Sequence, residues 1–205
     1  FVGPTGGGKT TTASLMARLY DPLQGMVLLN GRDLRSYTTA ERAEKIGFIL
    51  QEPFLFTGTL KENILYGNET GSDLSDDQFR DVISKAGLAD LLSRFEGGPD
   101  TPVLNSGETI SLGQRQLIAF MRAVLRRPEV LILDEATSNI DTVTEKQLET
   151  ILQKLPFSTT VIIIAHRLNT IENADEIFFV NSTRIIRAGS MSNALQLLMQ
   201  DRRES

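Results

Sequence analysis

The chain of 205 residues has no cysteine, a single histidine and only 6% aromatic residues. Without cysteine, a disulfide framework and any metal site built from thiolates are excluded. The longest apolar runs, such as residues 161–165, are far too short to span a bilayer. An excess of positive charge is also lacking. The net charge of −5 argues against nucleic acid as the main partner, because phosphate binding leaves a basic footprint.

What the chain does contain is ordinary for a globular protein, with 40% hydrophobic and 23% charged residues. Its length suits a single domain, or a core with one inserted subdomain. A chain of this length can bury a substantial hydrophobic core. Only two residues precede a glycine-rich loop, whereas such a loop normally follows a strand. We therefore expect that the sequence is truncated and that N-terminal strands are missing.

The apolar pattern of the first fifty or so residues predicts short alternating elements. A loop, a helix, a strand and a short apolar run are expected at residues 3–10, 11–20, 26–29 and 46–50. The strand enters a tight turn at Asn30-Gly31, because this pair tolerates the positive φ that such turns need.

From residue 59 to 127 the pattern becomes helical. Ser75 and Gln78 fit a capping box at the start of one helix. A second helix begins at about Gly113, and Pro128 marks its end.

Strand character then returns. Continuous apolar runs at residues 130–133 and 161–164 are typical of parallel strands that are covered on both faces. Between them, Thr142 and Glu145 fit the start of a helix. Two later strands and a closing helix are expected at residues 177–180, 184–187 and 193–200. The predicted layout is an α/β core interrupted by a helical insertion.

Residues 3–10 carry the first motif with chemical content. They fit the phosphate-loop pattern G-x-x-x-x-G-K-S/T, in which glycines let backbone N–H groups close around phosphate oxygens. We expect Lys9 to reach the β- and γ-phosphates and the Thr10 hydroxyl to ligate magnesium. A plain glycine turn is the alternative, which a full match at the start of a helix disfavours.

The apolar run at residues 130–133 ends in Asp134 and Glu135. Ligands of open α/β sheets bind at the carboxyl ends of strands, so both carboxylates are expected beside the phosphates. Asp134 would hold magnesium, directly or through water, and Glu135 would orient or deprotonate the attacking water. An apolar strand that ends in two acids is by itself more often structural, and the phosphate loop is what favours function here.

His166 follows the apolar run at residues 161–164 at the same kind of position. A lone histidine is by default an ordinary surface or core residue. Its place at a strand end predicts a hydrogen bond to the γ-phosphate and support for the attacking water.

Five segments occur in the order of the motifs of an ABC-transporter nucleotide-binding domain, which the whole sequence resembles. They look like the Walker A, Q-loop, signature, Walker B with D-loop, and switch-histidine motifs. The matching segments are residues 3–10, 49–53 with Gln51, 110–114, 133–141 and 165–168. Residues 56–64 resemble the exporter branch, which includes multidrug and lipid exporters and whose nucleotide-binding domains follow a membrane domain in the same chain.

The resemblance implies a P-loop NTPase (RecA-like) core with an inserted α-helical subdomain and a small antiparallel β part. It assigns residues 1–58 and 129–205 to the ATP-binding core and residues 59–128 to the helical subdomain with the signature. An upstream transmembrane domain is expected in the parent chain. The domain would lie at the cytoplasmic face of a membrane, the inner or plasma membrane of a bacterium.

The resemblance also implies a head-to-tail dimer that holds two ATP molecules. Glu135 would be the catalytic base, His166 the γ-phosphate switch, and Lys9 a further catalytic residue. Magnesium would be held by Thr10, Gln51 and Asp134. The nucleotide-binding residues would be Gly3, Pro4, Thr5, Gly6, Gly7, Gly8, Lys9, Thr10, Thr11, Gln51, Ser111, Gly113, Gln114 and Asp141, of which Ser111 and Gly113 cap the ATP held by the other subunit.

Residues 51–56 would contact the membrane domain, although Phe54, Leu55 and Phe56 equally fit an ordinary core. The sequence also departs from the family pattern. The aromatic residue that stacks on adenine lies upstream of the phosphate loop and is not in this sequence. Leu112 replaces the first glycine of the signature Leu-Ser-Gly-Gly-Gln, and Ile110 replaces its leucine.

Residues 101–107 also lack the acidic residue that many exporters place there. These departures predict a half-transporter that pairs with a different subunit. A homodimeric exporter that tolerates Leu112 is one alternative. An ABC-type ATPase of DNA repair or chromosome maintenance is another, which the negative net charge of the chain disfavours. A regulatory half that binds ATP without hydrolysis is the last, and Glu135 and His166 count against it.

Overall fold

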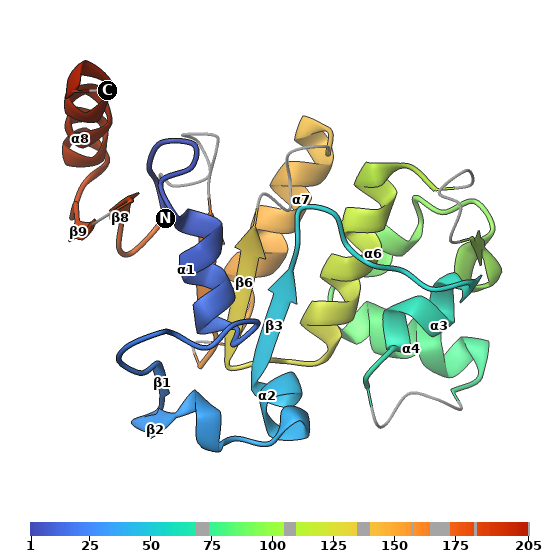
Figure 1. The fold of residues 1–205 in the computed structure, drawn as a ribbon. Helices are drawn as coiled ribbons and strands as arrows, with labels where there is room; N and C mark the ends of the chain where they lie inside the picture. The colour runs from blue at the N-terminus through green and yellow to red at the C-terminus, as the bar shows by residue number, and fades with distance from the viewer. Residues whose placement is uncertain are drawn as a thin grey trace. The chain divides into compact units, whose positions relative to one another are not determined.

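The computed structural model describes residues 1–68, 74–104, 110–134, 140–156, 158–164, 173–182 and 184–204. Helices and strands are interspersed along the chain (Figure 1). The helices are α1 (Lys9–Met16), η1 (Leu34–Ser36), α2 (Thr39–Lys45), α3 (Leu60–Leu65), α4 (Asp76–Lys85), α5 (Ala89–Leu92), η2 (Gly98–Asp100), α6 (Leu112–Leu125), α7 (Thr142–Gln153) and α8 (Met191–Glu204). Among the described residues, none of the helices combines the length and the apolar composition that a membrane span requires.

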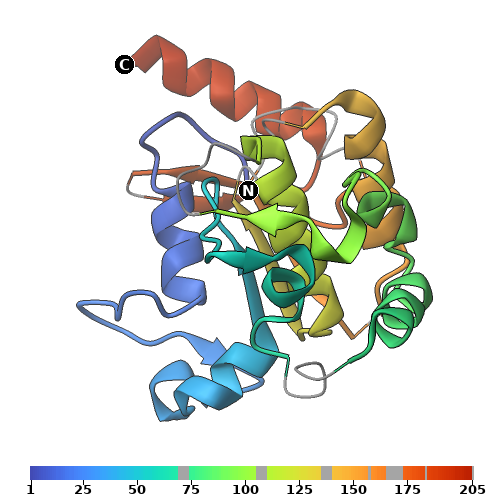
Figure 2. The ribbon, with the colours of Figure 1, turned by 90° about the vertical axis from the view of Figure 1, so that its right-hand side faces the viewer.

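The strands form one three-stranded sheet and several two-stranded ones. They are β1 (Leu28–Leu29), β2 (Arg32–Asp33), β3 (Ile46–Ile49), β4 (Gly58–Thr59), β5 (Pro102–Val103), β6 (Val130–Asp134), β7 (Thr160–Ile164), β8 (Phe178–Asn181) and β9 (Arg184–Arg187). The three-stranded sheet has the order β3-β6-β7, and the arrows of β3 and β6 point the same way in Figure 1. The pairs β1–β2, β4–β5 and β8–β9 are antiparallel, as Figure 2 shows for the short arrows of β4 and β5.

Most of the predicted elements are confirmed, with shifts at their ends. The predicted helix at residues 11–20 was misplaced, because α1 begins at Lys9, inside the phosphate-loop motif, and ends at Met16. The closing helix is longer than predicted. The helix expected from about Gly113 begins at Leu112, with Ser111 as its N-cap. The N-cap of α7 is Asp141 and not Thr142, because the Asp141 carboxylate accepts the first backbone N–H groups.

The chain divides into two compact units, and the boundary falls within β6 and β7. Unit 1 comprises Phe1–Thr38, Ile132–Glu135 and Ile162–Ser205, and unit 2 comprises Thr39–Leu131 and Ala136–Val161. The division into a core at residues 1–58 and 129–205 and a helical subdomain at 59–128 stays a prediction.

Unit 1 has an apolar cluster around the β8–β9 hairpin. Val2 bridges Phe179 in the parallel sense, so the residues before the glycine-rich loop extend this hairpin. Ala194 brings α8 onto the same cluster. This packing holds Val2 on the hairpin, immediately before the phosphate loop begins.

Unit 2 is built around α6, which packs against α3 and β3. Seven of its apolar side chains and Gln116 are buried: Leu117, Ile118, Ala119, Phe120, Met121, Ala123 and Val124. The helix begins with a capping box in which Ser111 and Gln114 each accept a hydrogen bond from the backbone N–H of the other. The capping box predicted at Ser75 and Gln78 is confirmed at the start of α4.

Candidate functional site

The residue before the glycine-rich loop is fixed on β8. The Val2 N–H donates to the Phe178 carbonyl at 2.9 Å, and the Val180 N–H donates to the Val2 carbonyl at 2.7 Å. These two hydrogen bonds hold the entry to the loop in one position against a buried strand. Such a support is what a loop needs if its backbone N–H groups are to bind an anion without rearrangement.

Two glycines of the loop lie against the carbonyl oxygen of Val180. A Cβ on Gly3 would lie 2.0 Å from that oxygen, and a Cβ on Gly7 would lie 2.8 Å from it and 3.0 Å from the Pro4 carbonyl oxygen. No side chain fits at either position without moving the backbone. The glycines therefore allow the loop to fold tightly over β8 and to present its backbone.

The loop runs directly into α1. Gly8 is the N-cap residue, and no side chain caps the helix. The first backbone N–H groups of an α-helix have no partner within the helix. At an uncapped N-terminus that follows a glycine-rich loop, these groups and the helix dipole favour an anion such as phosphate.

Lys9 is only 6% exposed, and its Nζ donates to the carbonyls of Gly3 at 3.0 Å and Pro4 at 2.8 Å. The ammonium therefore closes the loop on itself. A buried cation held beside an uncapped helix N-terminus adds positive charge where the sequence predicts the phosphates.

The other end of the site is a hydroxyl–carboxylate pair. The Thr10 hydroxyl donates to Asp134 Oδ1 at 3.1 Å. Asp134 ends β6 and is 4% exposed. Both groups offer oxygen atoms, which are the ligands that Mg²⁺ prefers, and Mg²⁺ commonly takes one or two protein carboxylates beside substrate phosphates. The residues present therefore fit a magnesium ion bound together with a nucleotide.

Gln51 and the signature residues belong to unit 2. The carbonyl of Gln51, two residues after the end of β3, accepts a hydrogen bond from Gln116 Nε2 at 3.0 Å. Ser111 and Gln114 form the capping box of α6, and Gly113 is its second residue. Leu112 is the first residue of that helix, a helical position that leucine adopts readily.

The carboxylate of Asp141 caps the start of α7. It accepts from the N–H groups of Val143 at 3.1 Å and Thr144 at 3.0 Å, and it also lies 3.4 Å from a guanidinium nitrogen of Arg94. The Thr144 hydroxyl and N–H, helped by Arg94, hold the pKa of the Asp141 carboxyl below its ordinary value. The predicted contact of Asp141 with nucleotide stays a prediction.

Within unit 1, the structure thus brings together the whole glycine-rich loop, Thr11 and Asp134. Gln51, Ser111, Gly113, Gln114 and Asp141 form part of unit 2. Glu135 and His166, the predicted base and switch, lie outside the described residues.

Sequence reasoning missed two residues that contact the Q-loop segment. Gln116 and Arg122 both come from α6 and donate to backbone carbonyls of residues 51 and 54. The only signal in the sequence is that each is a polar residue within a helix that is otherwise rich in apolar ones. Such a residue is ordinarily placed on the solvent face of a helix, so the pattern alone does not reveal these contacts.

The family model described as ABC transporter matches residues 1–138. The chain belongs to the ABC transporter family. It is 47% identical over 190 residues to an uncharacterised ABC transporter ATP-binding protein, YfiC, of Bacillus subtilis (strain 168). This alignment covers 93% of the chain and 31% of that protein. The chain is also 43% identical over 196 residues to the mitochondrial potassium channel ATP-binding subunit of Rattus norvegicus, covering 95% of the chain and 27% of the relative.

A solved structure of a bacterial Atm1-family ABC exporter with ATP bound superposes on this ABC domain with a TM-score of 0.80. The sequences are 34% identical, and the match covers 97% of this chain and 34% of that one. The chain thus spans about a third, or less, of the length of these relatives. The P-loop NTPase fold is confirmed, and the chain is an ATP-binding, ABC-type ATPase domain.

Proposed function

We propose that this ABC domain hydrolyses MgATP to drive export of a substrate across a membrane. The observation that carries the proposal is the hydrogen bond between Thr10 and Asp134, which places the end of the phosphate loop and the end of β6 at one point. A hydroxyl and a buried carboxylate beside an uncapped helix N-terminus suit magnesium and a triphosphate.

The phosphate loop does the binding in this proposal. The backbone of residues 3–8 and the N–H groups of Lys9, Thr10 and Thr11 surround the phosphates, and the Lys9 ammonium turns from its own loop to the β- and γ-phosphates. Thr10 and Asp134 hold magnesium, and on family resemblance Gln51 joins them. Bound magnesium would neutralise charge that develops on the phosphate oxygens.

Glu135 is proposed as the general base for the attacking water, and His166 as a hydrogen-bond donor to the γ-phosphate. Both follow strands in the sequence, and Glu135 directly follows Asp134. Placing the base next to the magnesium ligand allows one strand end to position the ion and the water together.

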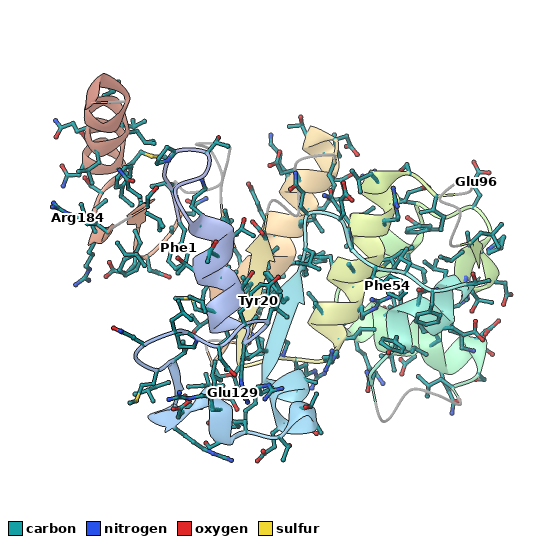
Figure 3. The ribbon with its side chains drawn as sticks, viewed as in Figure 1. Phe1, Tyr20, Phe54, Glu96, Glu129 and Arg184 are labelled. Atoms are coloured by element: carbon teal, nitrogen blue, oxygen red, sulfur yellow. The ribbon has the colours of Figure 1, made fainter. Side chains whose placement is uncertain are left out.

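The proposed assembly is a dimer of nucleotide-binding domains attached to a membrane domain, at the cytoplasmic face of the membrane. Ser111, Gly113, Gln114 and the start of α6 would cap ATP held by the other subunit, with Asp141 near the same interface. Residues 51–56 would contact the membrane domain. In support, the side chain of Phe54 is 74% exposed and is drawn beside α3 and α6 in Figure 3.

We further propose that the second nucleotide-binding domain belongs to a different subunit. The support is Leu112, which puts a branched apolar side chain at the first position of α6 where the family signature has glycine. Because this position is helical, the leucine does not strain the backbone, and its effect comes from the bulk of its side chain beside the capped phosphate.

The test of hydrolysis and coupling uses the full-length transporter, reconstituted with its partner subunit in vesicles. We expect ATP hydrolysis that needs magnesium, and Lys9→Ala should abolish both hydrolysis and tight ATP binding. Double-stranded DNA should not change the rate, since the alternative of a DNA-maintenance ATPase predicts stimulation. Magnesium-independent hydrolysis, or full activity of Lys9→Ala, would reject the proposal.

A further inference from the structure

Helix α6 contacts the segment that contains Gln51 at two separate points. The side-chain amide of Gln116 donates to the Gln51 carbonyl at 3.0 Å. The guanidinium of Arg122 donates to the Phe54 carbonyl at 3.1 Å. All four residues belong to unit 2.

The spacing of these two contacts matches along the helix and along the segment. The two donors are six positions apart on the α-helix, a rise of about 9 Å. The two acceptors are three positions apart in the segment, which spans at most about 10 Å when extended. Residues 51–54 therefore run alongside α6, with each end held by one side chain of the helix.

Stability does not account for the amide of Gln116. The side chain is fully buried, at 0% exposure, and its Oε1 has no hydrogen-bond partner among the described residues. A buried polar atom without a partner destabilises a fold, so an apolar residue of the same size would suit the core better. What the amide provides is the hydrogen bond to Gln51.

Arg122 connects the other end of the segment to α3. Its Nε donates to the Asn63 carbonyl at 2.7 Å, and its guanidinium lies 5.6 Å from the centre of the Tyr66 ring. The Asn63 side chain in turn accepts from the Phe56 N–H at 3.1 Å and donates to the Phe56 carbonyl at 2.9 Å. The residues that follow Gln51 are therefore anchored on α6 and α3 together.

We propose that Gln116 and Arg122 are positioning residues that clamp residues 51–54 onto α6. A shift of α6, which begins at the signature residue Ser111, then moves Gln51 and the exposed Phe54 with it. The clamp therefore links the start of α6, which is proposed to cap the partner's nucleotide, to the segment of residues 51–54. In that segment, Gln51 is proposed to lie at the magnesium site and Phe54 to contact the membrane domain. The consequence for magnesium rests on the proposed role of Gln51.

The first test measures the motion of the segment without nucleotide. The chain has no cysteine, so Glu52→Cys, at an exposed position, gives this domain a single site for a spin label. The label is read in the full-length protein after cysteines elsewhere are replaced. Gln116→Met and Arg122→Lys should each shorten the correlation time of the label by about twofold, since one anchor is lost.

Gln147→Met is the matched control, because it also removes a side-chain amide in unit 2, one that accepts from Arg94 at 3.0 Å. It should leave the label unchanged. Gln116→Met should not lower the melting temperature, since it also removes the unpartnered oxygen. An unchanged label in both Gln116→Met and Arg122→Lys overturns the clamp.

The second test separates the clamp from the role of Gln51. Gln116→Met should raise the magnesium concentration for half-maximal ATP hydrolysis by about fivefold, and should add nothing in a Gln51→Ala background. If Gln51→Ala itself leaves the magnesium dependence unchanged, the proposed role of Gln51 fails. The clamp is then tested by the correlation time of the spin label alone. If Gln51→Ala changes it and Gln116→Met does not, the clamp is overturned.

Discussion

The Thr10 hydroxyl lies 3.1 Å from Asp134 Oδ1, although 124 residues separate the two in the sequence. Thr10 belongs to the first turn of α1, and Asp134 ends β6. The contact joins the two halves of the proposed magnesium site within one compact unit, which also holds Lys9 and the glycine-rich loop. It is therefore the structural basis for the predictions about ATP and magnesium.

The first prediction concerns the hydroxyl of Thr10. Thr10→Val keeps the shape of the side chain but removes one oxygen ligand, so MgATP should bind about tenfold more weakly. Binding of ATP without magnesium should change little. Titration calorimetry with and without magnesium measures both. Thr12→Val is the control, because the Thr12 hydroxyl donates to the Gly8 carbonyl of the same helix turn and not to Asp134. Equal effects of the two variants would contradict the role of Thr10.

The second prediction concerns the buried amide of Asn63, which is 0% exposed. Asn63→Leu leaves the Phe56 N–H and carbonyl without their partners, so it should destabilise the domain by about 3 kcal/mol. Chemical denaturation measures the change. Lys85→Ala, in an exposed ion pair with Asp81, should cost less than about 0.5 kcal/mol. A loss at Asn63 no larger than at Lys85 would show that these hydrogen bonds do not hold α3 in place.

The third prediction concerns pH and Asp141. Its pKa is lowered in the folded state, chiefly by the hydrogen bond from the Thr144 hydroxyl. The carboxylate therefore stabilises the fold above the ordinary carboxyl pKa of about 4, and this stability is lost as the pH falls through the lower, folded value.

Asp141→Asn should consequently reduce the fall in melting temperature between about pH 6 and about pH 3. Asparagine is also a good N-cap, so stability near neutral pH should change little. Asp81→Asn removes a carboxylate from an exposed ion pair and should not reduce the fall to the same extent. A pH profile of Asp141→Asn identical to that of the parent would contradict the prediction.

The fourth prediction concerns the partner subunit. If Leu112 weakens the cap on the partner's ATP, Leu112→Gly should change nucleotide occupancy or turnover at the partner's site. The full-length protein purified alone should hydrolyse ATP poorly, because its own site would lack a complete signature. Robust, cooperative hydrolysis by a homodimer that is unaffected by Leu112→Gly would rule out the heterodimer.

Much of the fold follows from local chemistry in the sequence. The Asn30-Gly31 turn is confirmed, with φ angles of 52° and 77°. The continuous apolar runs are confirmed as β6 and β7. The start of α6 was placed one residue late, because the capping box of Ser111 and Gln114 was not recognised.

The elements that were missed carry little periodic signal. Helix α2 has no buried residue, so no apolar stripe marks it. Strands β4 and β5 have two residues each, which is too short for alternation to be visible. The contacts of Gln116 and Arg122 depend on tertiary packing between segments that are 65 and 68 residues apart, and local patterns carry no information about such pairs.

In the proposed mechanism, this domain hydrolyses ATP with Glu135 as the base, next to Asp134, the proposed magnesium ligand. The most direct test is to measure ATP binding and single-turnover hydrolysis by Glu135→Gln in the full-length transporter. The variant should bind MgATP as tightly as the parent and hydrolyse it about 10² to 10⁴ times more slowly. Hydrolysis within about a factor of two of the parent would contradict the account, since a general base contributes far more than that.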